Sequence, residues 1–307
     1  MTRIMGIINV TPDSFWSGSR VQDKTTLLER VRFMIAHGAD AIDVGGCSTR
    51  PNAVQASQDE EMERLEWGLD AIRTEFPDLL LSVDTYRPMI AERCIREWKA
   101  DIINDVYGGN DDMYKVVAET GVQYVLMWSE TIKEDPVGEM MSFFKEKLQI
   151  LEKAGIDVKH KVILDPGYGF GKTVEQNYTV LAHQAELCKF GLPVLSALSR
   201  KSMAWKLLKI TPEQALPATV VMDTVAVQQG ADWIRRAPYS CPVRKARRRQ
   251  KAVRRSEHAH PDQGLHVRRY ADHLRNELHV SAVDVRHVLE AGRDHHGGDD
   301  FLAEVLL

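Results

Sequence analysis

The stretch "KVILDPGYGFGKT", residues 161–173, joins a short apolar run to an aspartate and a turn that contains three glycines. An apolar run of this length, followed by turn residues, indicates a buried strand that ends at Asp165. Glycine permits a sharp backbone turn and lets the chain approach a ligand closely. Alone, the turn is weak evidence. It lacks the GxxxxGK[ST] spacing of a phosphate-binding loop and fits an ordinary tight turn equally well.

Seven further apolar runs of similar length alternate with amphipathic helical patterns over residues 1–235. The eight runs are "RIMGIIN" (3–9), "DAIDV" (40–44), "LLLSVD" (79–84), "ADIIND" (100–105), "QYVLM" (123–127), "KVILD" (161–165), "LPVLSAL" (192–198) and "DWIR" (232–235). Strands that alternate with helices indicate a parallel sheet with right-handed crossovers. Eight such units predict an α/β fold of the (βα)8 TIM-barrel type. An open doubly wound sheet is the alternative.

Polar residues follow the strands, at the end where barrels of this type carry their chemistry. Asp84, Asn104 and Asp165 end three strands, and Lys201 follows a fourth. Such a group suits a flat heterocycle edged with N–H donors and one carbonyl, since carboxylate and amide oxygens accept while lysine donates. A single aspartate of this kind is often structural; the set predicts a shared binding site.

A second polar group comes from the first two strand ends. Asn9 follows the first strand, and Ser48, Thr49 and Arg50 follow the second. Arginine binds phosphate oxygens in a bidentate manner, so this group can hold an anion. A carboxylate or amide oxygen could also carry a magnesium ion on a diphosphate.

Composition narrows the class of protein. The chain has 307 residues, a net charge of −4 and a hydrophobic content of 44%. These values allow a sizeable core and give no overall attraction to nucleic acid or acidic membranes. No apolar run approaches the length of a membrane span, and the N-terminus does not resemble a signal peptide, so we expect a cytoplasmic protein. Four widely spaced cysteines suggest neither a zinc site nor a disulfide framework.

The composition changes near residue 235. Eight of the eleven histidines and a cluster of arginines follow this point, and the regular apolar runs stop. The segment "PVRKARRRQKAVRR" has too narrow an apolar stripe for the outer helix of a barrel. We therefore expect a barrel domain over residues 1–235 and an atypical basic tail over 236–307, disordered or out of frame, in place of the last helix.

The motifs resemble those of one family, in order and at natural spacing. They are "MGIINVTPDSF", "GADAIDVGGCSTRP", "SVDTYRP", "IINDVYGG", "DPGYGFGKTVEQN" and "LSRKS", and they resemble dihydropteroate synthase over residues 3–235. The resemblance implies a dimeric (βα)8 barrel. It also implies a transferase of folate biosynthesis that joins 6-hydroxymethyl-7,8-dihydropterin diphosphate to 4-aminobenzoate and releases diphosphate, with Mg²⁺ as cofactor.

The resemblance also implies roles for individual residues. By this resemblance, the pterin would be bound by Asp84, Asn104, Asp165, Lys201 and Arg235. Diphosphate and magnesium would be bound by Asn9 and Arg50, and aminobenzoate by Thr49, Pro51, Lys201 and Ser202. The catalytic set is Asp84, Asp165, Lys201 and Arg50, while the loops with Asp13 and Phe15 close over the substrates.

Two other functions stay open. A pterin-binding methyltransferase domain shares the barrel and the pterin acids, but it does not need Asn9, "STRP" or "SRKS". A non-catalytic pterin binder, or an impaired enzyme, would follow from the altered C-terminus. Nucleic-acid binding by the basic tail is disfavoured, because no aromatic platform or recognised module accompanies the arginines.

Four features depart from the family pattern. Cys47 replaces a glutamate, Trp128 a histidine and Trp16 a small residue; we interpret Cys47 as a packing residue. The fourth departure follows Arg235, where the family reads Arg-Val-His-Asp and this chain reads Arg-Arg-Ala-Pro. The histidine expected to face the diphosphate is thus missing.

Two explanations account for the fourth departure. One is a natural basic extension. The other, which we favour, is a one-base insertion after the codon of Arg235. Arg-Ala-Pro can be encoded as CGT GCA CCN, and a shift of one base reads GTG CAC, which is Val-His. The next shifted codon begins with C and cannot encode the family's aspartate, so the match is incomplete.

Overall fold

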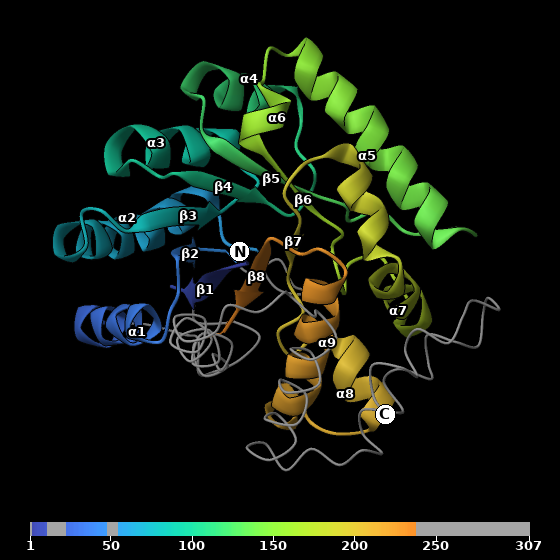
Figure 1. Ribbon diagram of the computed structural model, residues 1–307. Helices are drawn as coiled ribbons and strands as arrows, with labels where there is room; N and C mark the ends of the chain where they lie inside the picture. The colour runs from blue at the N-terminus through green and yellow to red at the C-terminus, as the bar shows by residue number, and fades with distance from the viewer. Residues whose placement is uncertain (1, 11–22, 48–54, 238–307) are drawn as a thin grey trace, which may run out of the picture.

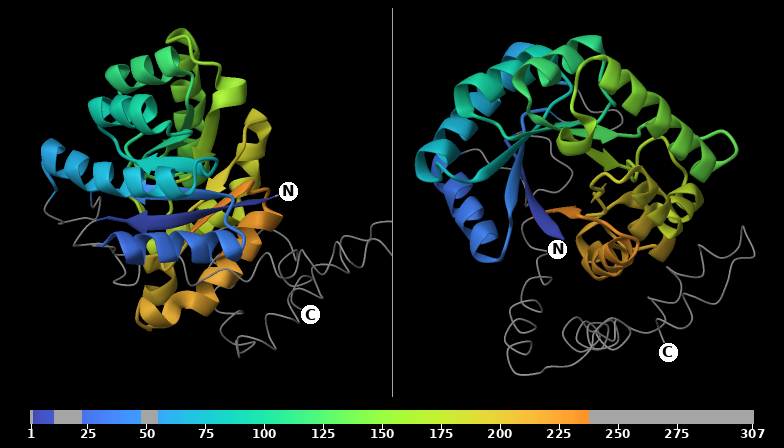
Figure 2. Two further views of the ribbon diagram at one scale, coloured as in Figure 1. Left: turned by 90° about the vertical axis from the view of Figure 1, so that its left-hand side faces the viewer. Right: turned by 45° about the horizontal axis from the view of Figure 1, so that its top comes forward.

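The computed structural model describes residues 2–10, 23–47 and 55–237, and these form a parallel α/β barrel (Figures 1 and 2). The strands lie in the order β6-β5-β4-β3-β2-β1-β8-β7. Every strand pairing is parallel. The strands are β1 (Arg3–Asn9), β2 (Ala41–Gly45), β3 (Leu80–Asp84), β4 (Ile102–Asp105), β5 (Gln123–Met127), β6 (Val162–Asp165), β7 (Leu195–Ser196) and β8 (Trp233–Arg236). The predicted (βα)8 barrel is confirmed, and the open sheet is excluded.

The barrel closes between β6 and β7. An isolated parallel bridge joins Leu164 to Val194, and the Leu164 N–H donates to the Pro193 carbonyl at 2.9 Å. The expected seventh strand, residues 192–198, is wrong in length, because β7 spans two residues. Pro193 has no N–H to give to a ladder, which accounts for the late start of the strand.

Helices surround the strands, as the right-hand view of Figure 2 shows. They are α1 (Lys24–Ala36), α2 (Gln58–Glu75), α3 (Pro88–Trp98), α4 (Asp111–Thr120), α5 (Pro136–Lys153), α6 (Val158–Lys161), α7 (Val174–Ala182), α8 (Ser202–Leu208) and α9 (Leu216–Gln228), with the 3₁₀ turns η2 (Gln184–Phe190) and η3 (Glu213–Ala215). Of these, the sequence patterns did not predict α6, α8 or η3. No helix in the described part of the chain is both long and apolar enough to cross a membrane.

Local signals explain where the helices begin. Ser57 caps α2 by accepting from the Glu60 N–H, while the Glu60 carboxylate accepts from the Ser57 N–H. Thr173 and Gln176 form the same reciprocal pair at the start of α7. Each pair satisfies two donors that the first turn of a helix leaves open. The pair at Thr173 also fixes the point where the glycine-rich turn ends.

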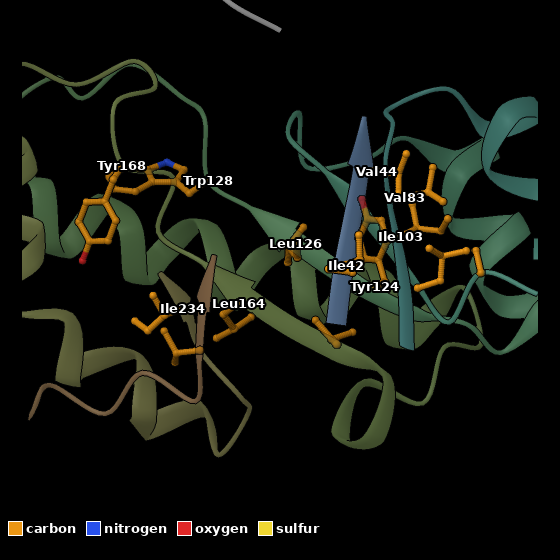
Figure 3. Close-up of a cluster of buried hydrophobic side chains, with 14 of the residues drawn as sticks. Ile42, Val44, Val83, Ile103, Tyr124, Leu126, Trp128, Leu164, Tyr168 and Ile234 are labelled. Carbon is orange, nitrogen blue, oxygen red and sulfur yellow. The ribbon is translucent and has the colours of Figure 1, made fainter. Parts of the chain in front are cut away.

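Two apolar layers hold the barrel together. The larger layer lies between strands and helices and includes Ile42, Val83, Tyr124 and Leu164 (Figure 3). The smaller layer fills the barrel interior, and its buried members are Met5, Ala41, Ile102, Val125, Ile163, Leu195, Ala197 and Trp233. Side chains of a strand alternate between its two faces, so most strands contribute to both layers.

The last strand carries a buried charge on its outer face. Arg236 is 2% exposed, and its Nε lies 2.8 Å from Oδ2 of Asp223 on α9. Its two Nη atoms have no hydrogen-bond partner within the described residues. Burial raises the pKa of Asp223 to about 6, and the charge of Arg236 opposes this rise. The boundary predicted at residue 235 stays a prediction, since residues 238–307 lie outside the described part.

We expect this buried ion pair to destabilise the fold. Replacing a buried pair by apolar residues of similar volume stabilises proteins by about 1–4 kcal/mol, whereas removing one partner costs about 3–5 kcal/mol. The double variant Asp223→Leu/Arg236→Met should therefore need more urea to unfold than the unmodified chain, and Asp223→Ala alone should need less. As a control, removing the exposed pair of Arg32 and Glu75 should change the free energy of unfolding by less than about 1 kcal/mol. A double variant that unfolds at lower urea contradicts this expectation.

Candidate active site

The polar side chains lie one layer above the apolar interior of the barrel. Ile102, Ile163 and Trp233 belong to that interior. Two positions further along the same strands stand Asn104, Asp165 and Arg235, so they share the inward face. All three strands are parallel, and these residues therefore gather at the carboxyl end of the barrel. The structure thus brings the predicted pterin residues to a common mouth.

One register row crosses the first four strands at this end. Asn9 pairs with Gly45, Gly45 with Asp84, and Asp84 with Asn104. A Cβ placed on Gly45 would lie 3.1 Å from Oδ1 of Asn9 and 3.6 Å from Cβ of Asp84. The absence of a side chain at Gly45 lets these neighbours approach each other. The residue predicted to hold the metal therefore adjoins the residues predicted to hold the pterin.

Arg235 joins two acids across the barrel. Its Nε donates to Oδ2 of Asp43 at 2.6 Å, and its Nη2 donates to Oδ2 of Asp84 at 2.5 Å. Burial raises the pKa of Asp84 to about 7, and the Arg235 charge opposes this rise. The two carboxylates raise the pKa of Arg235 despite its burial, so the guanidinium stays charged. The site is a compact network of opposite charges.

Asp43 is the main residue that the sequence analysis missed. It is fully buried on β2, and its carboxylate also accepts from Ser82 Oγ at 2.6 Å and from Asn104 Nδ2 at 3.2 Å. It stands within the strand run, two positions before Gly45. The sequence did contain a sign of its role. Strands that are buried on both faces are almost wholly apolar, so a carboxylate inside such a strand indicates a specific polar contact.

Asp165 is held by the glycine-rich turn that follows it. Its Oδ1 accepts from the Gly167 N–H at 2.8 Å, and burial raises the pKa of its carboxyl. Gly167 has φ +68°, a left-handed conformation that favours glycine, and a Cβ there would collide with the Trp128 carbonyl. The turn therefore fixes one carboxylate oxygen of Asp165 and leaves the other to the mouth of the barrel.

Lys201 approaches the same turn from the other side. A Cβ on Gly169 would lie 3.1 Å from Cδ of Lys201, and the Lys201 Nζ lies 4.4 Å from the centroid of the Phe170 ring. Burial lowers the pKa of Lys201 to about 8, and the negative charges of Asp165 and Asp84 oppose this fall. Ser202, the next residue, is the first of α8 and is half-buried. The lysine thus completes the site opposite Asp84 and Asn104.

A buried triad supports the end of β3. Glu61 is fully buried, accepts from Thr85 Oγ1 at 2.7 Å and pairs with Arg87. Arg87 also donates to the Ser57 and Ala56 carbonyls. This network ties the residue after Asp84 to α2 and so restricts the position of the Asp84 carboxylate.

The predicted departures occupy packing positions where they are described. Trp128 is 1% exposed, and Lys172 Nζ lies 4.1 Å from the centroid of its ring. Lys172 also donates to the carbonyls of Trp128, Gly167 and Phe170, so it fastens the turn to β5. Cys47 is 9% exposed, and burial raises the pKa of its thiol, as expected of a packing residue.

Several predicted site residues belong to the two loops that follow β1 and β2. Those that lie outside the described residues are Asp13, Phe15, Trp16, Ser48, Thr49, Arg50 and Pro51. Within the described part, no group of three or more His, Cys, Asp or Glu side chains could hold a metal ion. The roles of Arg50, Thr49 and Pro51 and the metal role of Asn9 stay predictions.

A parallel eight-stranded barrel with a charged cluster at the carboxyl ends of its strands defines the (βα)8 class of enzymes. The sequence model described as "Pterin binding enzyme" matches residues 5–236. The curated dihydropteroate synthase of Escherichia coli K12 is 38% identical over 242 residues, covering 76% of this chain and 85% of the relative. The dihydropteroate synthase of Bacillus subtilis is 39% identical over 238 residues, covering 76% of this chain and 82% of the relative.

Solved structures show the same likeness. The dihydropteroate synthase of Yersinia pestis, solved with a sulfonamide drug complex, has a TM-score of 0.75 at 33% identity and covers 83% of this chain and 95% of its own. The dihydropteroate synthase of Xanthomonas albilineans, solved with 4-aminobenzoic acid, has a TM-score of 0.74 at 35% identity. The match covers 85% of this chain and 94% of that structure. The chain belongs to the pterin-binding enzyme family, in its dihydropteroate synthase branch, and is a transferase of folate biosynthesis.

Proposed function

We propose that the barrel condenses 6-hydroxymethyl-7,8-dihydropterin diphosphate with 4-aminobenzoate to give 7,8-dihydropteroate and diphosphate. The observation that carries this proposal is the convergence of Asp84, Asn104, Asp165, Lys201 and Arg235 at one end of the barrel. Family membership assigns the reaction type, and the site supplies matching chemistry. The methyltransferase alternative is not favoured by any of the relatives described above.

The pterin ring would be recognised by its edge. Asp84, Asn104 and Asp165 present oxygen acceptors for the ring N–H and amino donors. Lys201 is the cation on the opposite side, next to the glycine-rich turn, and can donate to the ring carbonyl or a ring nitrogen. Arg235 keeps the Asp84 carboxylate in place through their ion pair. The set therefore complements a heterocycle with several donors and few acceptors.

Asn9 is suited to a magnesium ion shared with the diphosphate. Mg²⁺ takes one or two protein oxygens and completes its coordination with substrate phosphates and water. The Asn9 amide oxygen lies beside Gly45 and Asp84 at the mouth, which places an oxygen ligand next to the proposed pterin site. When bound, the ion would neutralise the charge of the leaving diphosphate, with Arg50 as a second cation.

The protein itself needs no nucleophile for this reaction. Diphosphate departs with the C–O bonding electrons and leaves a cationic methylene group on the pterin. The amine of aminobenzoate attacks this carbon and then loses a proton. The carboxylates of Asp84 and Asp165 would lie beside the ring on which positive charge develops, and they would stabilise the departing state electrostatically. The chain's residues thus bind, orient and stabilise charge.

A diphosphate-release assay with both substrates tests the proposal. We expect release that depends on 4-aminobenzoate, and we expect a version with the reading frame restored after Arg235 to be faster than the chain as written. Pterin binding without turnover in both versions would favour the non-catalytic binder instead. Sequencing the gene across the codon of Arg235 separately tests the frameshift hypothesis.

The pH dependence of pterin binding should follow the two shifted groups. Burial raises the pKa of Asp84 to about 7 and lowers the pKa of Lys201 to about 8. Below about pH 7 Asp84 takes up a proton, so it loses its charge and one of its oxygens becomes a donor. Above about pH 8 Lys201 loses its charge. We therefore expect the affinity to be highest between these values.

Calorimetric titration with 6-hydroxymethylpterin across acidic and alkaline buffers measures this profile. In Lys201→Met the alkaline fall should disappear while the acidic fall remains. Ionisation of the ligand itself affects both proteins alike, so the difference reports the lysine. An alkaline fall of equal size in both proteins would contradict the assignment.

We also propose, from the family resemblance, that the enzyme acts as a cytoplasmic homodimer on small-molecule substrates. Light scattering coupled to gel filtration tests the dimer by its mass. A mass of one chain at micromolar concentration would count against it.

A further inference from the structure

The carboxylate of Asp43 has three donors and no solvent exposure. Its Oδ1 accepts from Ser82 Oγ at 2.6 Å. Its Oδ2 accepts from Arg235 Nε at 2.6 Å and from Asn104 Nδ2 at 3.2 Å. Asp43 is 0% exposed, one layer deeper than the row of Asn9, Gly45 and Asp84. The side chain therefore lies beneath the proposed pterin site and joins two of its members.

This arrangement fixes which way the Asn104 amide faces. An ionised carboxylate only accepts hydrogen bonds, so the amide must turn its Nδ2 toward Asp43. A flipped amide would place its oxygen against the Asp43 oxygens, and the Nδ2 bond would be lost. The Arg235 guanidinium pairs with the Asp43 carboxylate and holds it in place. Asn104 thus has one allowed orientation.

The allowed orientation leaves an unused acceptor. Oδ1 of Asn104 is buried and has no hydrogen-bond partner within the described residues. A buried acceptor without a donor is unfavourable, and a ligand N–H that reaches it removes that penalty. Asn104 pairs with Asp84 in the same register row, so this acceptor belongs to the proposed pterin site.

We propose that Asp43 is a positioning residue for substrate selection: it holds the Asn104 amide so that Oδ1 accepts from a ring N–H, and it thereby restricts the site to rings with a donor at that place. This inference rests on the proposed function and deepens it. Asp84 and Asp165 cannot become donors without binding a proton. Asn104 can, by rotating its amide, so the selectivity of the site depends on what prevents that rotation.

Two ring systems distinguish a fixed amide from a free one. A pterin carries a 2-amino group beside an acceptor at N1, whereas the corresponding lumazine carries a 2-carbonyl beside an N1–H, so donor and acceptor are exchanged at these two neighbouring positions. The readout is the ratio of the dissociation constants of 6-hydroxymethyllumazine and 6-hydroxymethylpterin, measured by calorimetry. We expect the unmodified chain to prefer the pterin. Failure to bind the pterin at all would instead overturn the proposed function itself.

In Asp43→Ala the preference should fall about tenfold, because the Asn104 amide can then present either its oxygen or its nitrogen. The matched control is Asp105→Ala, which removes another buried carboxylate, on β4 directly after Asn104. The Asp105 carboxylate accepts from Tyr124 Oη and the Tyr107 N–H, on the opposite face of the strand. The control should keep the ratio even if it weakens both affinities. An unchanged ratio in Asp43→Ala overturns the inference.

A second pair of variants covers the case in which Asp43→Ala does not fold. Asn104→Asp places two carboxylates against each other. In Asp43→Ser/Asn104→Asp the serine hydroxyl can accept from Arg235 Nε and donate to the new carboxylate, whose other oxygen stays an acceptor for the ring. We expect the double variant to bind the pterin about tenfold more tightly than Asn104→Asp alone. A double variant that binds no more tightly than the single one overturns the inference.

Discussion

Asp165→Asn is expected to lower the rate of diphosphate release about a thousandfold. The asparagine oxygen can still accept from the Gly167 N–H, so the turn keeps its geometry. The amide nitrogen then replaces the second carboxylate oxygen and faces the ring with a donor where an acceptor is needed. Losing a charged hydrogen bond and leaving two donors unmatched costs about 4 kcal/mol, which corresponds to the expected factor.

Asp232→Asn is the matched control for this variant. Asp232 Oδ2 accepts from the Val194 N–H at 3.1 Å, which is the same kind of bond, but at the amino end of β8. Its replacement should leave the rate of diphosphate release unchanged. Equal losses in the two variants would show that Asp165 acts only by holding its turn.

The second large effect is expected from Lys201→Met. Methionine keeps an unbranched stem beside Gly169 and Phe170 but removes the charge and the donor. Loss of one charge-assisted hydrogen bond to the ring costs about 3 kcal/mol, so binding of 6-hydroxymethylpterin should weaken about a hundredfold. Calorimetric titration measures the change.

Lys206→Met on the same helix serves as the control. Lys206 is exposed on α8 and lies over the Trp205 ring, away from the acids of the site. Its replacement should leave the affinity unchanged. A similar loss in both variants would indicate a general attraction to positive charge instead of a specific contact.

The positions of the site residues could be predicted because parallel strands impose a simple rule. Asp84 and Asp165 end their strands and Asn104 is the last residue but one of β4, and the carboxyl ends of all eight strands meet at one rim. The alternation of inward and outward side chains then decides which acids face the mouth. Asp105 follows Asn104 directly, yet it bonds to Tyr124 on the outer face.

Other features depend on contacts that no local pattern reveals. Asp43 stands inside a strand run, and only its partners on β3, β4 and β8 show its place in the site. The seventh strand is short because its pairing starts after Pro193. Helix α8 has seven residues, too few for a periodic pattern to be recognised.

The end of β8 bears on the reading-frame hypothesis. The family has valine at the position of Arg236, and here a fully buried arginine has Nη donors without partners in the described part of the chain. The charge of Arg236 is matched by Asp223, but buried donors without partners are rare in natural proteins. The unused donors fit a change of frame directly after Arg235, whereas the ion pair fits a natural sequence.

A crystal structure of the chain with 6-hydroxymethylpterin bound shows directly whether these side chains form the pterin site. We expect the ring at the carboxyl end of the barrel, within hydrogen-bonding distance of Asp84, Asn104, Asp165 and Lys201. The Asn104 oxygen should meet a ring N–H while its nitrogen stays on Asp43. A ring bound elsewhere, or one that contacts none of these side chains, would contradict the account.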